Sequence, residues 1–257
     1  FVMVEKLERI GRFTSSNIWK LTTLDRSGKS FSAPALTYIE EKRAERTLGR
    51  SIDLGKQSQA TIWGRVMEYY CNEFHLGLEY SLCSKTTLVH PKFKFWSGSP
   101  DFTKPKTTGD VKCNEPKRHY ELTTNLIKLR DRLITLEEFK KEEKEVYWQV
   151  VSNCILTGNP IGEIIAYTPT YAQIKSIQED WEVDNYIQGL NKTLSEHLEV
   201  DFQYFHYLIN KELHNLPYIP EWSEFPNFTS VEFEIPEEDI IFITKCVIEA
   251  EKILTNG

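Results

Sequence analysis

The sequence lacks the features of disulfide-bonded, membrane-spanning and fibrous proteins. Its five cysteines are an odd number with no C-x-x-C pair, so reduced thiols in a cytosolic setting are expected rather than a disulfide framework or a zinc knuckle. The longest apolar runs, such as Ile240–Ile243, are far shorter than the roughly 20 residues that cross a bilayer. With only 12 glycines and 11 prolines in 257 residues, a fibrous or low-complexity chain is excluded.

Histidine spacing gives no metal-site pattern either. The six histidines show no H-x-H or H-x-x-x-H pair, so none is predicted to bind a metal. No repeat and no Gly/Ser/Pro-rich linker divides the chain. We therefore expect a single domain over residues 1–257, with a catalytic core at about 7–170 and a helical C-terminal extension at about 171–257.

The net charge of −7 would argue against a nucleic-acid partner, but the charges are unevenly distributed. Residues 1–119 carry a net charge of +7, and residues 120–257 carry −14. This distribution is consistent with one basic side that faces a polyanion, although ordinary surface charge explains it equally well.

Hydrophobic periodicity predicts helices and strands in an order typical of an α/β fold with a mixed sheet. A helix is expected at 15–21, with Thr14 or Ser15 as its N-cap, and others at 58–74, 137–156, 171–215 and 236–254. Residues 78–113 read as a meander of about three strands that includes Lys92–Trp96, and Ile161–Tyr167 reads as a buried strand.

Two aspartates and a lysine form the clearest candidate site. Asp110 and Lys112 are two residues apart, so on a strand they project from the same face. Asp101 is expected to close the preceding strand, and a loop of about eight residues would return it beside Asp110. Converging carboxylates repel each other unless a cation joins them, and hard oxygen ligands suit Mg²⁺ or Mn²⁺. With a lysine to orient or help deprotonate a water, these are the parts that phosphodiester hydrolysis requires.

Four segments in order resemble the PD-(D/E)xK nucleases, specifically the lambda-exonuclease-like and YqaJ viral recombinase branch. They cover about residues 7–170 and are Arg9–Ser16 (RIGRFTSS), Trp63–Glu68 (WGRVME), the pair Gly98–Asp101 (GSPD) and Asp110–Lys112 (DVK), and Tyr147–Val150 (YWQV). The resemblance implies a restriction-endonuclease-like core, with a central mixed β-sheet flanked by helices.

The same resemblance implies roles for individual residues. Mg²⁺ would be held by the carboxylates of Asp101 and Asp110 and by the backbone carbonyl of Val111. The carboxylate of Glu68 would complete the site. Lys112 would position the attacking water, and Gln149 would support the site from the following helix. Arg9 and Ser16 would bind a terminal 5′-phosphate, although a serine at a helix start is equally expected to be only a cap.

Two positions depart from the family pattern. Asp110 stands where glutamate is commoner, and Val151 stands where the family has the second glutamine of Q-x-Q. The tryptophans are expected to be core residues rather than base-stacking platforms.

The resemblance implies a Mg²⁺-dependent exonuclease of the phage recombination type in a bacterial or phage-infected cytoplasm. It would degrade one strand of double-stranded DNA from a 5′ end, close into a ring-shaped homotrimer and work with a single-strand annealing protein. The alternatives are an endonuclease or nickase on the same core, and a non-catalytic module that binds DNA ends.

Overall fold

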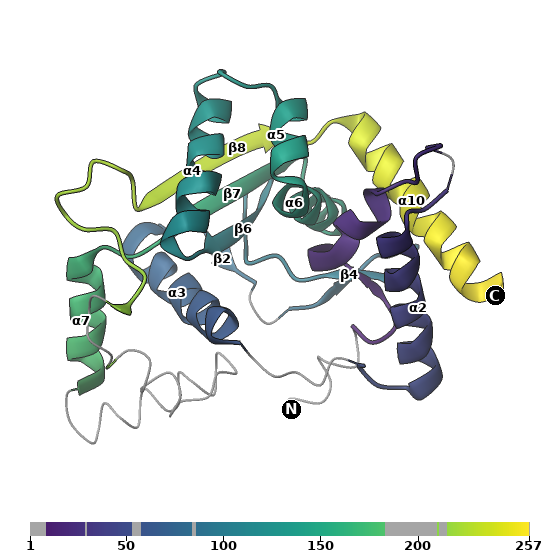
Figure 1. Ribbon diagram of the computed structural model, residues 1–257, viewed down its shortest axis with the longest axis horizontal. Coiled ribbons are helices and arrows are strands. Elements are labelled where there is room, and N and C mark those ends of the chain that lie inside the picture. Colours follow the sequence, from purple (N-terminus) through teal and green to yellow (C-terminus); the bar gives the residue numbers. More distant parts are fainter. Residues whose placement is uncertain are drawn as a thin grey trace.

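Helices surround two β-sheets in the computed structural model, which describes residues 9–28, 30–52, 58–83, 86–182, 210 and 215–256 (Figure 1). The helices are η1 (Ser15–Thr22, a 3₁₀ helix), α2 (Ala33–Leu48), α3 (Gln59–His75), α4 (Pro116–Arg130), α5 (Leu136–Glu142), α6 (Lys144–Thr157), α7 (Tyr171–Glu182) and α10 (Glu237–Asn256). The strands are β1 (Phe13–Thr14), β2 (Ser81–Leu82), β3 (Leu88–Val89), β4 (Trp96–Gly98), β5 (Phe102–Lys104), β6 (Thr107–Cys113), β7 (Ile161–Tyr167) and β8 (Phe228–Glu234).

The larger sheet has five strands in the order β2-β5-β6-β7-β8. Strands β6 and β7 are parallel, and the other neighbours are antiparallel. Because a parallel pair needs a long crossover, the chain between β6 and β7 forms α4, α5 and α6, which pack on the sheet. The predicted α/β fold with a central mixed sheet is confirmed.

The smaller sheet, in the order β1-β4-β3, positions the N-terminal segment. Strand β1 runs parallel to β4, with Thr14 opposite Ser97. The start of η1 therefore lies beside the end of β4, which leads directly into Pro100 and Asp101.

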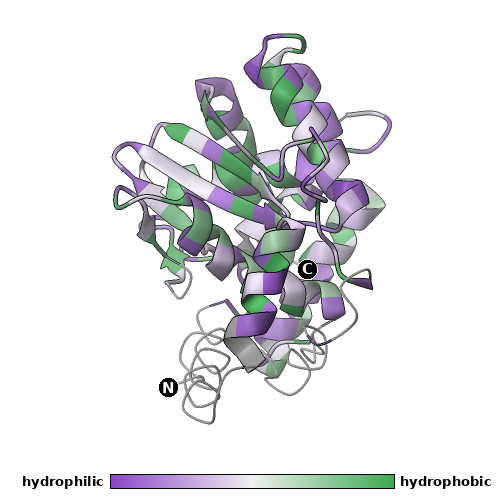
Figure 2. Cartoon of the chain, turned by 90° about the vertical axis from the view of Figure 1, so that its left-hand side faces the viewer, coloured by the Kyte–Doolittle hydropathy of each residue, from purple (hydrophilic) through white to green (hydrophobic). Residues whose placement is uncertain are grey.

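Each face of the larger sheet packs against its own set of helices. Ile164 and Ala166 of β7 join a large apolar cluster with η1, α2, α4, α5, α6 and α10. Val111 of β6 and Ile165 and Tyr167 of β7 face the other way, toward α3 and α7. Hydrophobic and hydrophilic segments are interleaved along these helices (Figure 2), as amphipathic helices on a sheet require.

Helix α3 forms where the sequence predicts it. The Ser58 side chain accepts the Thr61 N–H at 3.1 Å, which caps the first turn. Ile62, Val66 and Met67 are buried, whereas Phe74, at the end of the predicted helix, is 39% exposed. The helix after residue 14 also forms, with Ile18 and Leu21 buried, but it is 3₁₀ and its N-cap Thr14 makes no side-chain capping bond.

The predicted helix over 137–156 is two helices, because the backbone at Glu143 leaves the helical region with φ −112° and ψ 39°. The Glu143 carboxylate is buried and accepts bonds from Arg118 and from Asn125, at 2.9 Å. A buried charge bonded in this way fixes the break between α5 and α6.

The predicted strand over 92–96 is wrong. His90 Nδ1 accepts the backbone N–H groups of Lys92 and Phe93 at 3.1 and 3.0 Å and turns the chain there, so β4 starts only at Trp96. Among the described residues between 78 and 113, five strands, β2 to β6, stand where about three were expected.

The C-terminal part is helical in α7 and α10, as predicted, and also contributes β8 to the sheet. Residues 183–209 and 211–214, predicted to be helical, lie outside the described residues. No described helix combines the length and hydropathy needed to cross a membrane.

Candidate active site

The second half of β6 has an open edge, because β5 pairs with it only from Thr107 to Gly109. Asp101, immediately before β5, fills part of the gap: its Oδ2 accepts the N–H of Val111 at 2.7 Å. On a strand the N–H and C=O of one residue point to the same side. The carbonyl of Val111 therefore faces the same open edge as the Asp101 carboxylate.

The chain geometry that delivers Asp101 differs from the prediction. Asp101 was expected to end a strand before a loop of about eight residues, whereas β5 follows it and the return is the short turn at Pro105 and Lys106. Lys106 adopts φ +66° in that turn. The predicted neighbourhood of Asp101 and Asp110 holds, since Asp101 N–H donates to Gly109 at 3.2 Å.

Asp110, Lys112 and Gln149 form a closed polar triangle. Lys112 Nζ lies 2.5 Å from Asp110 Oδ2 and donates to Gln149 Oε1 at 3.0 Å. Gln149 Nε2, from α6, donates to Asp110 Oδ1 at 2.5 Å. Because Asp110 is only 1% exposed, these contacts fix its orientation. The predicted supporting residue Gln149 thus lies against both groups it was expected to support.

Glu68 approaches this triangle from α3. Burial and the nearby negative charge of Asp110 raise the pKa of Glu68 to about 7, and the positive charges of Lys112 and Arg65 oppose that rise. Burial and the charges of Asp110 and Glu68 likewise raise the pKa of Asp101 well above its usual range. The three carboxylates are therefore near enough to repel each other.

Lys112 is held in its charged form. Burial alone would lower the pKa of its ammonium, but the carboxylates of Asp110 and Asp101 outweigh burial and raise it. A lysine in this state donates hydrogen bonds and stabilises negative charge, and it does not accept a proton. Of the two roles predicted for Lys112, this environment favours orienting a water over deprotonating it.

The donors at the open edge suit a hard divalent cation. Two carboxylates and the Val111 carbonyl are oxygen ligands, and the buried Asp110 Oδ2 has no hydrogen-bond partner besides its ion pair with Lys112. Among the described residues, no group of three or more His, Cys, Asp or Glu side chains gathers tightly enough to hold a metal. The fit therefore rests on Asp101, Asp110 and the carbonyl, and Glu68 as a ligand stays a prediction.

The burial of Glu68 beside Asp110 predicts a pH dependence of stability in metal-free protein. The pKa of Glu68 is about 7 in the folded chain, above its ordinary value of 4.5. The Glu68 carboxyl group therefore stays protonated to higher pH in the folded chain than in the unfolded chain. The free energy of unfolding is expected to fall, on the order of 2 kcal/mol, as pH rises from about 4.5 to 7. Urea unfolding in EDTA at pH 5 and 8 measures it.

Replacing Glu68 with glutamine is expected to flatten this pH profile. The exposed Glu73 on the same helix provides the control, and Glu73→Gln should keep the wild-type profile. A Glu68→Gln protein that loses as much stability with pH as wild type would refute this account.

Arg9 and Ser16, the predicted 5′-phosphate ligands, lie next to the elements that carry the carboxylates. Ser16 follows β1, beside the end of β4, and its hydroxyl lies 3.4 Å from that of Thr14. Arg9 is exposed at the surface, but the protein around it lowers the pKa of its guanidinium, Tyr38 opposes this change, and the charge of Arg65 lowers the pKa further. Arg9 thus lies near α3, where Arg65 stands one turn before Glu68.

Sequence reasoning missed two features of this region. Arg65 acts electrostatically on both Arg9 and Glu68, and its three-residue spacing from Glu68 was the available signal. The buried Ser15 hydroxyl lies 2.8 Å from that of Ser152, which also accepts the Trp96 indole N–H at 2.8 Å.

These contacts clarify the serine pair and the departure at Val151. Ser15 joins η1 to α6, which leaves Ser16 as the serine available to a ligand. Val151 is fully buried in the large apolar cluster. On α6 the residues three and four positions after Gln149, rather than Val151, share its face.

The fold matches solved structures at low sequence identity. No protein-family model and no curated protein sequence matches the chain. An alkaline exonuclease, LHK-Exo, from Laribacter hongkongensis matches with 12% identity and a TM-score of 0.56, over 98% of this chain and 94% of that one. A complex of LHK-Exo with dAMP gives 13% identity and a TM-score of 0.59, over 98% and 91%.

A phage-related exonuclease from Haemophilus somnus is similar to the same extent, with 16% identity and a TM-score of 0.57, over 95% of this chain and 93% of that one. The chain therefore has the fold of these exonucleases over nearly its whole length. The predicted resemblance to lambda-exonuclease-like proteins is confirmed at the level of the fold.

Proposed function

We propose that this chain is a metal-dependent deoxyribonuclease that digests one strand of duplex DNA from a 5′ end. The observation that carries the proposal is the gathering of Asp101, Asp110, Lys112 and Gln149 on the open edge of β6. The fold shared with exonucleases supports it, and the complex of LHK-Exo with dAMP is consistent with nucleotide chemistry in that fold.

Asp101, Asp110 and the Val111 carbonyl would hold Mg²⁺, with Mn²⁺ as an alternative, and Glu68 would complete the site. The bound cation would supply Lewis acidity and neutralise charge that develops on the phosphate. Lys112 Nζ, charged and fixed by Gln149, would donate a hydrogen bond to the attacking water and stabilise the developing charge. Gln149 fixes the relative positions of the Asp110 and Lys112 side chains by forming a hydrogen bond to each.

The remaining expectations belong to the same proposal. The substrate of the enzyme is double-stranded DNA, and the enzyme acts in the cytoplasm of a bacterial or phage-infected cell. Its partner is a single-strand annealing protein. The homotrimeric ring is tested by the mass of the protein in solution.

A digestion assay separates the proposal from its rivals. Linear 5′-phosphorylated duplex and closed circular duplex are incubated with the protein, in Mg²⁺ or in EDTA. Loss of linear DNA alone, only with Mg²⁺, is the expected result. Cutting of the circle would instead identify an endonuclease or nickase, and intact DNA in both forms, with DNA still bound, would identify an end-binding module.

Arg9→Ala is expected to slow digestion of 5′-phosphorylated ends by about ten- to a hundredfold and to change 5′-hydroxyl ends little, because a charge-assisted bond to the phosphate is lost. The measurement compares digestion rates of DNA with 5′-phosphate and 5′-hydroxyl ends. Arg50→Ala, at an exposed position, is the control and should digest both at the wild-type rate. Equal slowing on both ends would exclude Arg9 from the phosphate site.

A further inference from the structure

A cavity of about 700 Å³ runs along the outer edge of β8. Its wall includes the five consecutive residues Ser230–Glu234. Successive side chains of a strand point to opposite faces, so a space that contacts all five must lie along the edge of the strand. In the part of the chain that the structure describes, β8 is the last strand of its sheet, with β7 on its inner side.

The pairing register shows which backbone groups face this groove. Asn227 accepts the Thr168 N–H, and the Ile235 N–H donates to Pro160. Alternate β8 residues between these two positions bond to β7 in the same way. The N–H and C=O groups of Ser230, Glu232 and Glu234 therefore point away from β7, into the groove.

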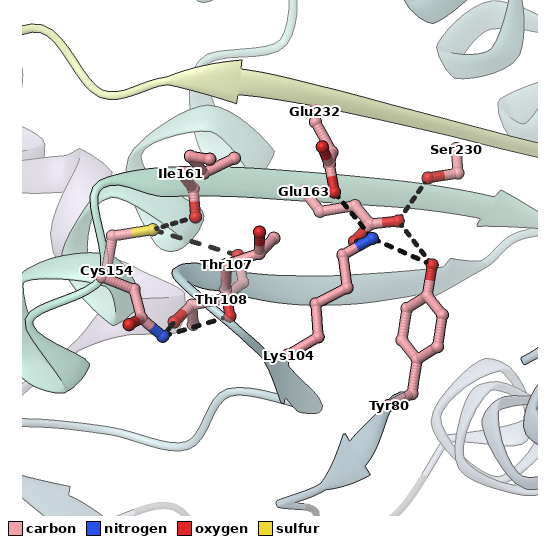
Figure 3. A network of polar contacts seen from close by, with 10 residues as sticks. Tyr80, Lys104, Thr107, Thr108, Cys154, Ile161, Glu163, Ser230 and Glu232 are labelled. Carbon is pink, nitrogen blue, oxygen red and sulfur yellow. Dashed lines mark hydrogen bonds and ion pairs between the residues drawn. The ribbon is translucent and has the colours of Figure 1, made fainter. Parts of the chain in front are cut away.

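One wall of the groove is a fixed polar network (Figure 3). Lys104 Nζ lies 2.8 Å from Glu163 Oε2 and 2.6 Å from Glu232 Oε1. Glu163, only 1% exposed, also accepts bonds from Tyr80 and Ser230 at 3.0 and 2.5 Å. These contacts hold the edge of β8 rigid and leave the wall with more negative than positive charge.

The opposite wall, from the end of α4 to the start of α5, is apolar and basic. Leu129 and Leu136 contribute its apolar part, and Arg132 and Arg130, whose Nε also pairs with Asp131 Oδ1 at 2.9 Å, contribute its positive charge. Both arginines are exposed, and Arg132 adopts φ +58° in the connecting turn. An open strand edge between an apolar, basic wall and a rigid polar wall has the parts that bind an added strand.

We propose that this groove binds an extended segment of a protein partner as an additional strand beside β8, with acidic side chains of that segment facing Arg130 and Arg132. The outward backbone groups supply hydrogen bonds to the segment, and the two arginines select its charge. A nucleic-acid strand fits less well, because phosphates along its backbone would also face Glu163, Glu232 and Glu234. An extended peptide can direct all its acidic side chains to the arginine wall, since alternate side chains point to opposite faces.

The polar wall of the groove and the candidate active site lie on opposite faces of the sheet. Glu163 is opposite Gly109 in the β6–β7 register, so its side chain points away from the face that carries Asp110 and Lys112. Partner binding here would leave the open edge of β6 accessible to DNA, and the proposal does not depend on the proposed nuclease function.

Fluorescence anisotropy with a labelled eight-residue peptide that alternates threonine and glutamate tests the proposal on the full chain. We expect this peptide to bind and a threonine–lysine peptide to bind at least about tenfold more weakly. A threonine–glutamate peptide N-methylated at every residue should not bind, since it has no backbone N–H to donate from either edge. Arg130→Glu combined with Arg132→Glu should weaken binding about tenfold. Lys128→Glu, an exposed charge reversal on α4, should leave binding unchanged.

Glu234→Pro removes one outward N–H and is expected to weaken binding, whereas Glu234→Ala keeps that N–H and should not. Three results would overturn the proposal: no binding of the threonine–glutamate peptide at millimolar concentration, equal binding of the N-methylated peptide, or equal binding by the double arginine variant. An oligonucleotide that binds in an Arg130- and Arg132-dependent manner would mark the groove as a nucleic-acid surface instead.

Discussion

Lys112→Ala is expected to slow phosphodiester cleavage by about a hundred- to a thousandfold, because a charged donor fixed beside the reacting phosphate is removed. Its ammonium is held in place by Asp110 and Gln149. Single-turnover digestion of linear duplex in Mg²⁺ measures the loss, and DNA affinity is measured separately. The rate is expected to fall without a matching loss of affinity.

Two controls keep this result interpretable. Lys128→Ala removes an exposed lysine on α4 and should digest DNA at the wild-type rate. The melting temperature of Lys112→Ala is measured because Asp110 loses its ion-pair partner. A folded Lys112→Ala protein that cleaves at the wild-type rate would remove Lys112 from the mechanism.

Gly109→Ala is expected to lower the free energy of unfolding by about 1–3 kcal/mol, the usual cost of overpacking a core. An added Cβ at Gly109 would lie 1.9 Å from the Phe102 ring. That ring is fully buried and packs edge-on against Tyr80, with centroids 5.0 Å apart, so it has little room to move. Urea unfolding gives the change.

Gly64→Ala is the matched substitution with the opposite expected sign. Gly64 lies inside α3, and an added Cβ would meet nothing within 4 Å. The alanine should therefore raise stability by about 0.5–1 kcal/mol through its helix propensity. Combining Gly109→Ala with Phe102→Leu should recover part of the loss, and a Gly109→Ala protein as stable as wild type would disprove the clash.

The candidate site was predictable because its members lie in short, nearly local patterns. Two-residue spacing on a strand placed Asp110 and Lys112 on one face. Asp101 comes near them because the β5–β6 hairpin lies between it and Asp110 in the chain. Gln149 comes from a distant helix, and only the family resemblance indicated it. The position of Val151 in the core depends on helix orientation, which the segment's own sequence does not determine.

The elements that were missed or misplaced depend on contacts distant in sequence. The break at Glu143 rests on side chains of α4, and β8 pairs with a strand more than 60 residues earlier. The turn after His90 depends on a ring nitrogen that accepts two N–H groups. Local propensity carries no information about such partners.

The open edge of β6 exists because β5 begins only at Phe102, opposite Gly109, and this has a consequence for solubility. An unpaired strand edge can join the edge of another molecule, and charged side chains prevent such pairing. At this edge the charges are those of the candidate catalytic residues. Removing several of them together to make an inactive protein would therefore also remove what keeps two molecules from pairing there, so single neutralising substitutions are the better inactive controls.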